Sequence, residues 1–224
     1  MSNLLLITKK IQEFDKKISV TGDKSLSIRW VLLASQAVGK STAYNLLMSE
    51  DVLASLDSIK KLGIKVRIYK NYCEIFGNGI NGFKYKKNLI INAKNSGTLG
   101  RLILGLLVKS PKKIKIIGDK SLSKRDFSRV TIPLEKFGAK FYYKTKSKLP
   151  LSILGSQSTH GIKYLENNGS AQCKSSVMLA ALNASGTTSI KAKKSRNHSE
   201  LLFKYLKIPI KIKKTKKFDF IDIK

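Results

Sequence analysis

The sequence has few cysteines and histidines, and this scarcity excludes two kinds of small fold. Only two cysteines and two histidines occur among 224 residues. Cys73 and Cys173 stand far apart, without the close spacing of a disulfide scaffold or a zinc knuckle. Together with His160 and His198 they form no metal-ligand set. We therefore expect no structural metal, and a protein of a reducing compartment.

Long hydrophobic runs are also missing. The apolar stretch at residues 4–7 is too short for the core of a signal peptide, and Lys9 and Lys10 follow it at once. No apolar stretch approaches the roughly 18 residues that a membrane helix needs. These absences predict a soluble, cytoplasmic protein.

Acidic residues are scarce, since 14 Asp and Glu stand against 44 Lys and Arg, for a formal net charge of +30. Such an excess suggests a nucleic-acid partner, because lysine and arginine neutralise phosphates. The lysines, however, are spread along the whole chain, with little aromatic interleaving of the kind that stacks on bases. A solvated lysine-rich surface is the simpler interpretation, and a small anionic substrate would also profit from the charge.

Three stretches of the chain share one order of elements: a turn rich in small residues, an apolar helix, a strand, an amphipathic helix and two further strands. The residues that open the first helix of each stretch, Ser25, Gly97 and Ser170, are 72 and 73 residues apart. Gly63 and Gly138 end the second helix of the first two units. The sequence predicts three βαβαββ repeats in one α/β domain, with helices packed inside mixed sheets.

The expected boundaries follow from these patterns. The repeats cover about residues 20–85, 86–155 and 156–224. We expect helices at residues 28–37, 50–62, 99–108, 128–137, 173–182 and 198–206. We expect strands at residues 41–46, 65–69, 72–76, 113–117, 140–143, 149–154, 187–190, 208–212 and 218–223.

The first helix of each unit carries a cation four residues after its small opening residue. The pairs are Ser25 with Arg29, Gly97 with Arg101, and Ser170 with Lys174. Residues four apart lie on one helix face, and the unpaired N–H groups of a helix start favour phosphate or carboxylate. If the three starts meet at one end of the domain, they form one anion-binding surface. The alternative is that the serines only cap helices and the cations are exposed.

Two further features have simpler interpretations. Gly39-Lys40-Ser41-Thr42 is similar to the tail of a phosphate-binding P-loop, but Ala34 stands where that motif needs glycine. We therefore reject a nucleoside triphosphate site there. Cys173 is expected to be a packed small apolar residue, since its predicted helix is apolar, and His198 to be a structural residue or a neighbour of an anion.

Five ordered motifs resemble the enolpyruvyl transferases of the 5-enolpyruvylshikimate-3-phosphate synthase family, and together they cover nearly the whole chain. They are Gly22-Asp23-Lys24-Ser25-Leu26-Ser27-Ile28-Arg29, Asn95-Ser96-Gly97-Thr98 with Arg101, Gly118-Asp119-Lys120-Ser121-Leu122-Ser123-Lys124-Arg125, Ser170-Ala171-Gln172 with Lys174, and Ser195-Arg196-Asn197-His198.

The resemblance implies transfer of the enolpyruvyl group of phosphoenolpyruvate to the 5-hydroxyl of shikimate 3-phosphate, in the shikimate pathway to chorismate and aromatic amino acids, with no cofactor. It implies that shikimate 3-phosphate contacts Lys24, Ser25, Arg29, Ser170, Ala171, Gln172 and Arg196. It implies that phosphoenolpyruvate contacts Lys24, Gly97, Arg125 and Gln172. Lys24 would lie between both substrates, and it is the one catalytic residue, a partial one, that the resemblance implies for this chain.

The family enzyme has two such domains and about twice this length. The resemblance therefore implies that residues 20–224 form the shikimate-3-phosphate-binding domain and that residues 1–19 belong with a second domain, in the same or a separate chain. The carboxylates that act as general acid and base belong to that second domain, so we expect the 224-residue chain to be inactive alone. Among several departures from the motifs, Asp126 follows Arg125 where proline is usual, and we expect the two to pair.

Two other classes of function remain open at this point. One is a basic nucleic-acid-binding module built from the same α/β units. The other is a non-catalytic scaffold or pseudoenzyme that associates with a second chain. The related enolpyruvyl transferase that acts on UDP-N-acetylglucosamine fits less well, because Lys24 is followed by Ser25 and the segment of Arg125 has no cysteine.

Overall fold

The computed structural model describes residues 6, 8–10, 13, 15 and 17–224. Its first unit consists of α1 (Lys24–Ala34), β1 (Val38–Tyr44), α2 (Glu50–Lys61), β2 (Lys65–Ile68) and β3 (Tyr72–Asn78). The second consists of β4 (Leu89–Asn92), α3 (Gly97–Leu106), β5 (Ile114–Ile117), the short 3-10 helix η1 (Leu122–Lys124), α4 (Ser128–Glu135), β6 (Lys140–Tyr143) and β7 (Leu151–Leu154). The third consists of β8 (Lys163–Glu166), α5 (Ala171–Ala181), β9 (Thr188–Lys193), α6 (His198–Tyr205), β10 (Ile210–Lys214) and β11 (Phe218–Ile223).

Each unit contributes one sheet, and the strand orders correspond. The second sheet runs β4-β5-β7-β6 and the third β8-β9-β11-β10, each with a parallel first pair and antiparallel pairs after it. The first sheet runs β1-β3-β2 and, within the described residues, has no strand in the position of β4 or β8. This topology agrees with three related units, the first of them described from its helix onward, and it confirms the α/β class with mixed sheets.

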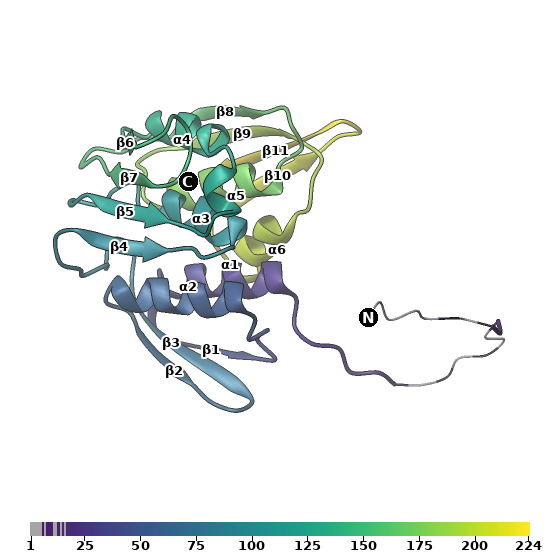
Figure 1. Cartoon of the computed structure of the whole chain (residues 1–224). Coiled ribbons are helices and arrows are strands. Elements are labelled where there is room, and N and C mark those ends of the chain that lie inside the picture. Colours follow the sequence, from purple (N-terminus) through teal and green to yellow (C-terminus); the bar gives the residue numbers. More distant parts are fainter. Residues whose placement is uncertain (1–5, 7, 11–12, 14, 16) are drawn as a thin grey trace.

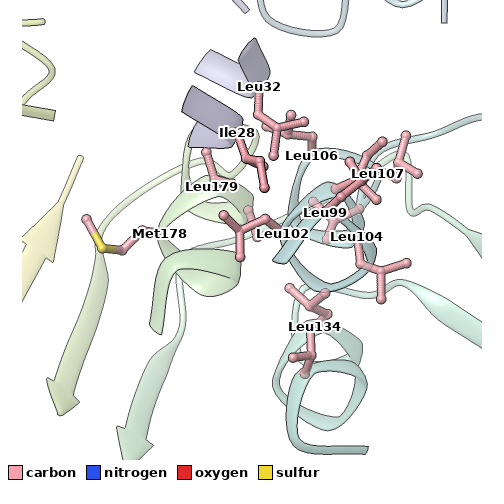
Figure 2. Packing of buried hydrophobic residues seen from close by; sticks show 14 of the residues in the cluster. Ile28, Leu32, Leu99, Leu102, Leu104, Leu106, Leu107, Leu134, Met178 and Leu179 are labelled. Carbon is pink, nitrogen blue, oxygen red and sulfur yellow. The ribbon is translucent and has the colours of Figure 1, made fainter. Parts of the chain in front are cut away.

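The helices lie between the sheets, with α3 and α5 in the middle of the molecule (Figure 1). Figure 2 shows how apolar side chains of α1, α3, α4 and α5 fill the space between these helices, among them Ile28, Leu102, Leu134 and Leu179. α3 is almost wholly apolar because it is surrounded by apolar neighbours, whereas α5 also buries Lys174, Ser175 and Ser176, which have polar partners. Among the described residues, no helix is long and apolar enough to cross a membrane.

All the expected helices and strands are present, and their boundaries differ by up to four residues. The largest difference is at α1, which begins at Lys24 instead of residue 28, because Asp23 caps the helix and brings the polar residues after it into the first turn. The expected strand at 41–46 lies at Val38–Tyr44, where it pairs with β3 along its whole length. The segment similar to a P-loop therefore lies inside a strand, in agreement with its rejection.

The two glycines expected at helix ends have the left-handed backbone that this position requires. Gly63 has φ +86° after α2 and Gly138 has φ +92° after α4. In the third unit Lys207 takes the same place with φ +55°, a region that side chains with a Cβ rarely adopt. The looser match of the third unit thus lies in residue type, whereas the backbone turn is the same.

The expected role of residues 1–19 falls mostly outside the described residues. Residues 17–23 run without regular structure up to α1, and the side chains of Ile18 and Val20 are exposed. The division at residue 20 stays a prediction.

Candidate functional site

The starts of α1, α3 and α5 are built alike. In each, the side chain before the helix accepts a hydrogen bond from a backbone N–H three residues on: Asp23 Oδ1 from Leu26 at 2.7 Å, Ser96 Oγ from Leu99 at 3.2 Å, and Ser170 Oγ from Cys173 at 3.3 Å. The cap satisfies one of the unpaired N–H groups of a helix start and leaves the preceding ones for a ligand. Ser170 is therefore a capping residue as well as a candidate contact, while Ser25 is a residue of the first turn.

Side-chain contacts bring the starts of α3 and α5 together. Gln172 Nε2 donates to Thr98 Oγ1 at 3.1 Å, and Arg101 Nη1 donates to Gln172 Oε1 at 3.0 Å. Ser176, one turn further along α5, donates to the backbone oxygen of Arg101 at 2.9 Å. Gln172 therefore links two of the three helix starts.

Arg29 joins α1 to the same group. Its guanidinium donates from Nε to Ser199 Oγ at 2.9 Å, from Nη2 to Ser175 Oγ at 3.1 Å and from Nη1 to the backbone oxygen of Ser25 at 3.0 Å. Only 3% of Arg29 is exposed, so it is a buried cation at the inner wall of the site. Burial lowers the pKa of Arg29 to about 10, against the opposing effect of the Glu200 carboxylate.

Gly97, the first residue of α3, lies between two guanidinium groups. A Cβ at this position would stand 2.9 Å from Nη1 of Arg101 and 2.9 Å from Nη1 of Arg125. Burial lowers the pKa of Arg101, and the positive charge of Arg125 lowers it further. Gly97 is thus buried against two guanidinium groups, and its lack of a side chain lets both of them lie close to the backbone at the start of α3.

Lys24 stands at the exposed rim. Its Nζ lies 2.9 Å from Oδ2 of Asp51, and its side chain is 54% exposed. Asp51 lies in the first turn of α2, where a carboxylate is also favoured by the helix start. An exposed pair of this kind contributes little to stability, so Lys24 can leave Asp51 for a ligand at small cost.

The three cations of the repeat are not equivalent, which corrects the expectation from the shared spacing. Counted from the capping residue, Arg29 is the sixth residue, Arg101 the fifth and Lys174 the fourth, so they point in different directions around their helices. Lys174 is fully buried and its Nζ lies 2.5 Å from Oε1 of Glu200. The alternative, in which the cations are exposed, is also wrong for Arg29 and Lys174. Lys174 is a buried partner in an ion pair and not an anion ligand.

The expected pairing of Asp126 with Arg125 is also absent from the described part of the chain. The carboxylate of Asp126 instead accepts from the backbone N–H of Ser128 at 2.8 Å and from its hydroxyl at 2.7 Å. These hydrogen bonds lower the pKa of Asp126. The backbone oxygen of Asp126 accepts from Arg101 Nη2 at 3.2 Å, so this departure from the motif supports α4 and Arg101 and leaves Arg125 exposed.

Two carboxylates that shape the site were missed in the sequence. Asp119 accepts from the backbone N–H of Leu122 and from Asn95 Nδ2, both at 2.6 Å, and these hydrogen bonds lower its pKa. The repeated Gly-Asp-Lys-Ser motif was the available signal, because Asp119, like Asp23, accepts a hydrogen bond from the backbone N–H three residues on. Glu166 is buried and accepts from the backbone N–H groups of Asn168 and Ser170, at 3.0 and 2.9 Å. No local sequence pattern predicts this role of Glu166.

The remaining candidates have the following environments. Cys173 is buried, which raises the pKa of its thiol, and this confirms a packed residue in place of a nucleophile.

His198 begins α6 near Arg29 and Arg196, and burial and these cations lower its pKa. Ala171 and Gln172 are partly buried, and Arg196 is exposed. His160 contacts the hydroxyls of Ser158 and Ser185, both at 2.9 Å, and neither of these is a candidate site residue.

The molecule also has an apolar hollow of about 350 Å³. It is lined in part by Leu33, Leu182 and Leu206, which lie at the C-terminal ends of α1, α5 and α6. The hollow therefore lies at the opposite ends of these helices from the capped starts, and it offers no cluster of cations for an anion.

An α/β domain whose capped helix starts gather cations around Gly97 and Gln172 offers the positive charge and the unpaired N–H groups that a small anion requires. Comparison with known proteins gives the particular family. The sequence profile of the EPSP synthase (3-phosphoshikimate 1-carboxyvinyltransferase) family matches residues 8–221, and the chain belongs to this family.

Individual relatives agree with that assignment. The chain is 39% identical over 193 residues to 3-phosphoshikimate 1-carboxyvinyltransferase of Bacillus subtilis, covering 85% of this chain and 45% of the relative. It is 38% identical over 189 residues to the protein of that description from Streptococcus mutans, covering 84% and 44%. A solved structure of EPSP synthase from Acinetobacter baumannii superposes with a TM-score of 0.85 at 32% identity, over 93% of this chain and 46% of that one. The chain thus spans about half the length of the relatives it matches.

Proposed function

We propose that the chain supplies the shikimate-3-phosphate side of the active site for enolpyruvyl transfer from phosphoenolpyruvate to the 5-hydroxyl of shikimate 3-phosphate. The observation that carries the proposal is the convergence of the family motifs: contacts of Gln172 and Arg29 join the starts of α1, α3 and α5. Such a gathering of helix starts and cations suits two anionic substrates.

The buried side of this site suits the phosphate or carboxylate of shikimate 3-phosphate. Arg29 uses three of its five N–H donors on protein oxygens and has two left for a ligand. Ser25, Ser170, Ala171 and Gln172 add hydroxyl, amide and backbone donors beside it. Arg196 and Lys24 extend the positive surface to the rim.

The second pocket suits phosphoenolpyruvate. Gly97 lets the guanidinium groups of Arg101 and Arg125 lie close to the backbone, and Arg125 is exposed. Gln172, already fixed by Thr98 and Arg101, lies between the two pockets, and Lys24 is the partial catalytic residue at the junction of the two substrates.

The chemistry forms a bond between the substrate 5-oxygen and the enolpyruvyl carbon and breaks the bond from that carbon to the phosphate oxygen, and the hydroxyl proton ends on the released phosphate. A general acid and base must therefore be in reach. Among the described carboxylates near the site, Glu200 is paired with Lys174, Asp23 and Asp119 accept hydrogen bonds from backbone N–H groups, and Asp51 pairs with Lys24 while Lys24 holds no ligand. This supports a binding half whose catalytic carboxylates lie on a second domain, with both substrates held between the two.

Within this proposal, residues 20–224 form the substrate-binding domain and residues 1–19 go with the second domain. The reaction belongs to the shikimate pathway, which leads to chorismate and the aromatic amino acids, and its place is the cytoplasm. Nucleic acid and scaffold roles are less well supported, because they leave the ordered motifs without a use.

The binding site is tested by calorimetric titration with shikimate 3-phosphate. Arg29→Ala and Gln172→Ala are expected to weaken binding by about tenfold or more, since each removes charge-assisted or fixed hydrogen bonds of about 1.5–3 kcal/mol. Arg67→Ala and Gln157→Ala, at exposed positions, serve as matched controls and should bind as the unchanged chain does. Equal affinity in all four variants, or salt-dependent binding to arbitrary DNA with no response to shikimate 3-phosphate, would contradict the proposal.

The half-site is tested by measuring phosphate release. We expect residues 1–224 alone to give no turnover, and turnover to appear when a second domain from one of the relatives is supplied as a separate chain. Full turnover by the 224-residue chain alone would refute the half-site.

A further inference from the structure

Two helices behind the site are joined by a pair of polar contacts one residue apart. Lys174 and Ser175 are neighbours on α5, and Ser199 and Glu200 are neighbours on α6. Lys174 Nζ lies 2.5 Å from Glu200 Oε1, and Ser199 Oγ donates to Ser175 Oγ at 2.7 Å. We call these two contacts the α5–α6 ladder.

The ion pair of the ladder is buried and isolated. Lys174 is 0% exposed and Glu200 3% exposed, and in the described part of the chain neither Lys174 Nζ nor Glu200 Oε2 has a hydrogen-bond partner. A buried ion pair of this kind is a poor source of stability compared with apolar residues of similar size. Its presence behind an anion site therefore calls for another explanation than folding.

The other contact of the ladder holds Arg29. Nε of Arg29 donates to Ser199 Oγ and Nη2 donates to Ser175 Oγ, so both hydroxyls that join the helices also orient the guanidinium. A shift of α6 relative to α5 separates these two acceptors. The direction of Arg29 thus depends on the spacing that the Lys174–Glu200 pair maintains.

Glu200 also acts on Arg29 through its charge. The charged groups that face Arg29 are Glu200 in α6, Arg196 before α6 and Asp23 before α1, with His198 close by. Among these, Glu200 exerts the largest effect that raises the pKa of Arg29, in opposition to burial and to Arg196. Because an arginine must be charged to bind an anion well, loss of Glu200 weakens the site as the pH rises.

We propose that Glu200 is a positioning residue for the anion site: through Lys174 it fixes α6 against α5, and through its charge it keeps Arg29 a cation directed at the ligand. This inference rests on the proposed function, since it assigns Arg29 to the binding of shikimate 3-phosphate. It adds a role for a residue that contacts no substrate.

The test follows Arg29 itself, by the 13Cζ resonance of isotope-labelled arginine as the pH is raised, with Arg29→Lys to assign the signal. The unchanged chain should show a midpoint at about pH 10. The double variant Lys174→Met with Glu200→Leu keeps the fold, because apolar residues replace both members of the pair. Its midpoint should fall, by at most about one pH unit, because the Glu200 carboxylate is lost while loss of the Lys174 ammonium opposes part of that fall. Glu200→Asp, which keeps the charge, should restore it, and Glu135→Gln, at an exposed carboxylate, should leave it unchanged.

Calorimetric titration with shikimate 3-phosphate from pH 7 to pH 10 is the second measurement. Affinity should weaken at lower pH in the double variant than in the unchanged chain, by no more than about twofold at pH 9, since a midpoint one unit lower leaves half of Arg29 charged there. If the unchanged chain binds shikimate 3-phosphate and the midpoint of Arg29 does not move in the double variant, the role of Glu200 is overturned while the proposed function stands. If the midpoint moves as expected and no variant or parent binds the substrate, the effect of Glu200 on Arg29 stands while the proposed function fails.

Discussion

The buried pair of Lys174 and Glu200 gives the most quantitative prediction on stability. Each member has the other as its partner and almost no exposure to water, so removal of one leaves an uncompensated charge in the core. Such a loss costs about 3–5 kcal/mol of unfolding free energy, whereas replacement of both by apolar residues is close to neutral. For a chain of this length, about 1 kcal/mol corresponds to roughly 2–4 °C in Tm. Lys174→Met and Glu200→Leu should therefore each lower Tm by about 6–20 °C.

The assay is urea unfolding of the parent, the two single variants and the double variant. We expect a coupling free energy of about 3 kcal/mol or more between the two positions, with unchanged dependence on urea. The exposed pair of Asp57 and Lys61, 3.0 Å apart, is the control, and Asp57→Asn should change stability by no more than about 0.5 kcal/mol. Single variants that lose less than about 1 kcal/mol, or a coupling near zero, would show that the pair does not carry a buried charge in the way described.

Two other predictions follow from backbone and packing. Gly97→Ala places a Cβ 2.9 Å from the guanidinium nitrogens of Arg101 and Arg125, and at least 0.5 Å of movement is needed to reach an ordinary contact of 3.4 Å. We expect the fold to persist, because both atoms end flexible side chains. In the assembled enzyme, the affinity for phosphoenolpyruvate, or for inhibitors that resemble it, should fall about tenfold. An unchanged inhibition constant would contradict a phosphoenolpyruvate site at Gly97. Lys207→Gly should raise the unfolding free energy by about 0.5–1 kcal/mol, since φ is +55° there. Lys204→Gly, inside α6, should lower it by about 1 kcal/mol, and equal effects of the two glycines would refute the argument.

Much of the architecture could be predicted because the same order of helices and strands recurs in three units, so the elements expected in one unit can be compared with those of the others. The glycines after α2 and α4 fixed the helix ends, and the left-handed turns at Gly63 and Gly138 confirm them. The start of α1 was harder to place, because the polar residues Lys24 and Ser25 in its first turn are also typical of a loop. The structure shows that Asp23 caps the helix directly before them.

The sequence identified the residues of the candidate site, but it did not show in which direction each side chain points. Spacing in the sequence made Arg29, Arg101 and Lys174 equivalent, whereas their distances from the caps differ by one residue at each step. A shift of one residue turns a side chain by about 100° around a helix. That rotation directs Arg101 to Gln172 and Lys174 to Glu200, a partner 26 residues away that only the packing of α5 on α6 reveals.

The central claim is that shikimate 3-phosphate binds where the three helix starts meet. It is tested most directly by titrating the 15N-labelled chain with shikimate 3-phosphate and mapping the backbone amides that shift. We expect a saturable response with the largest shifts at Lys24 and Ser25, at Gly97 and Thr98, and at Ala171 and Gln172. Shifts spread over the lysine-rich surface, or centred on the apolar hollow at the other ends of the helices, would contradict it.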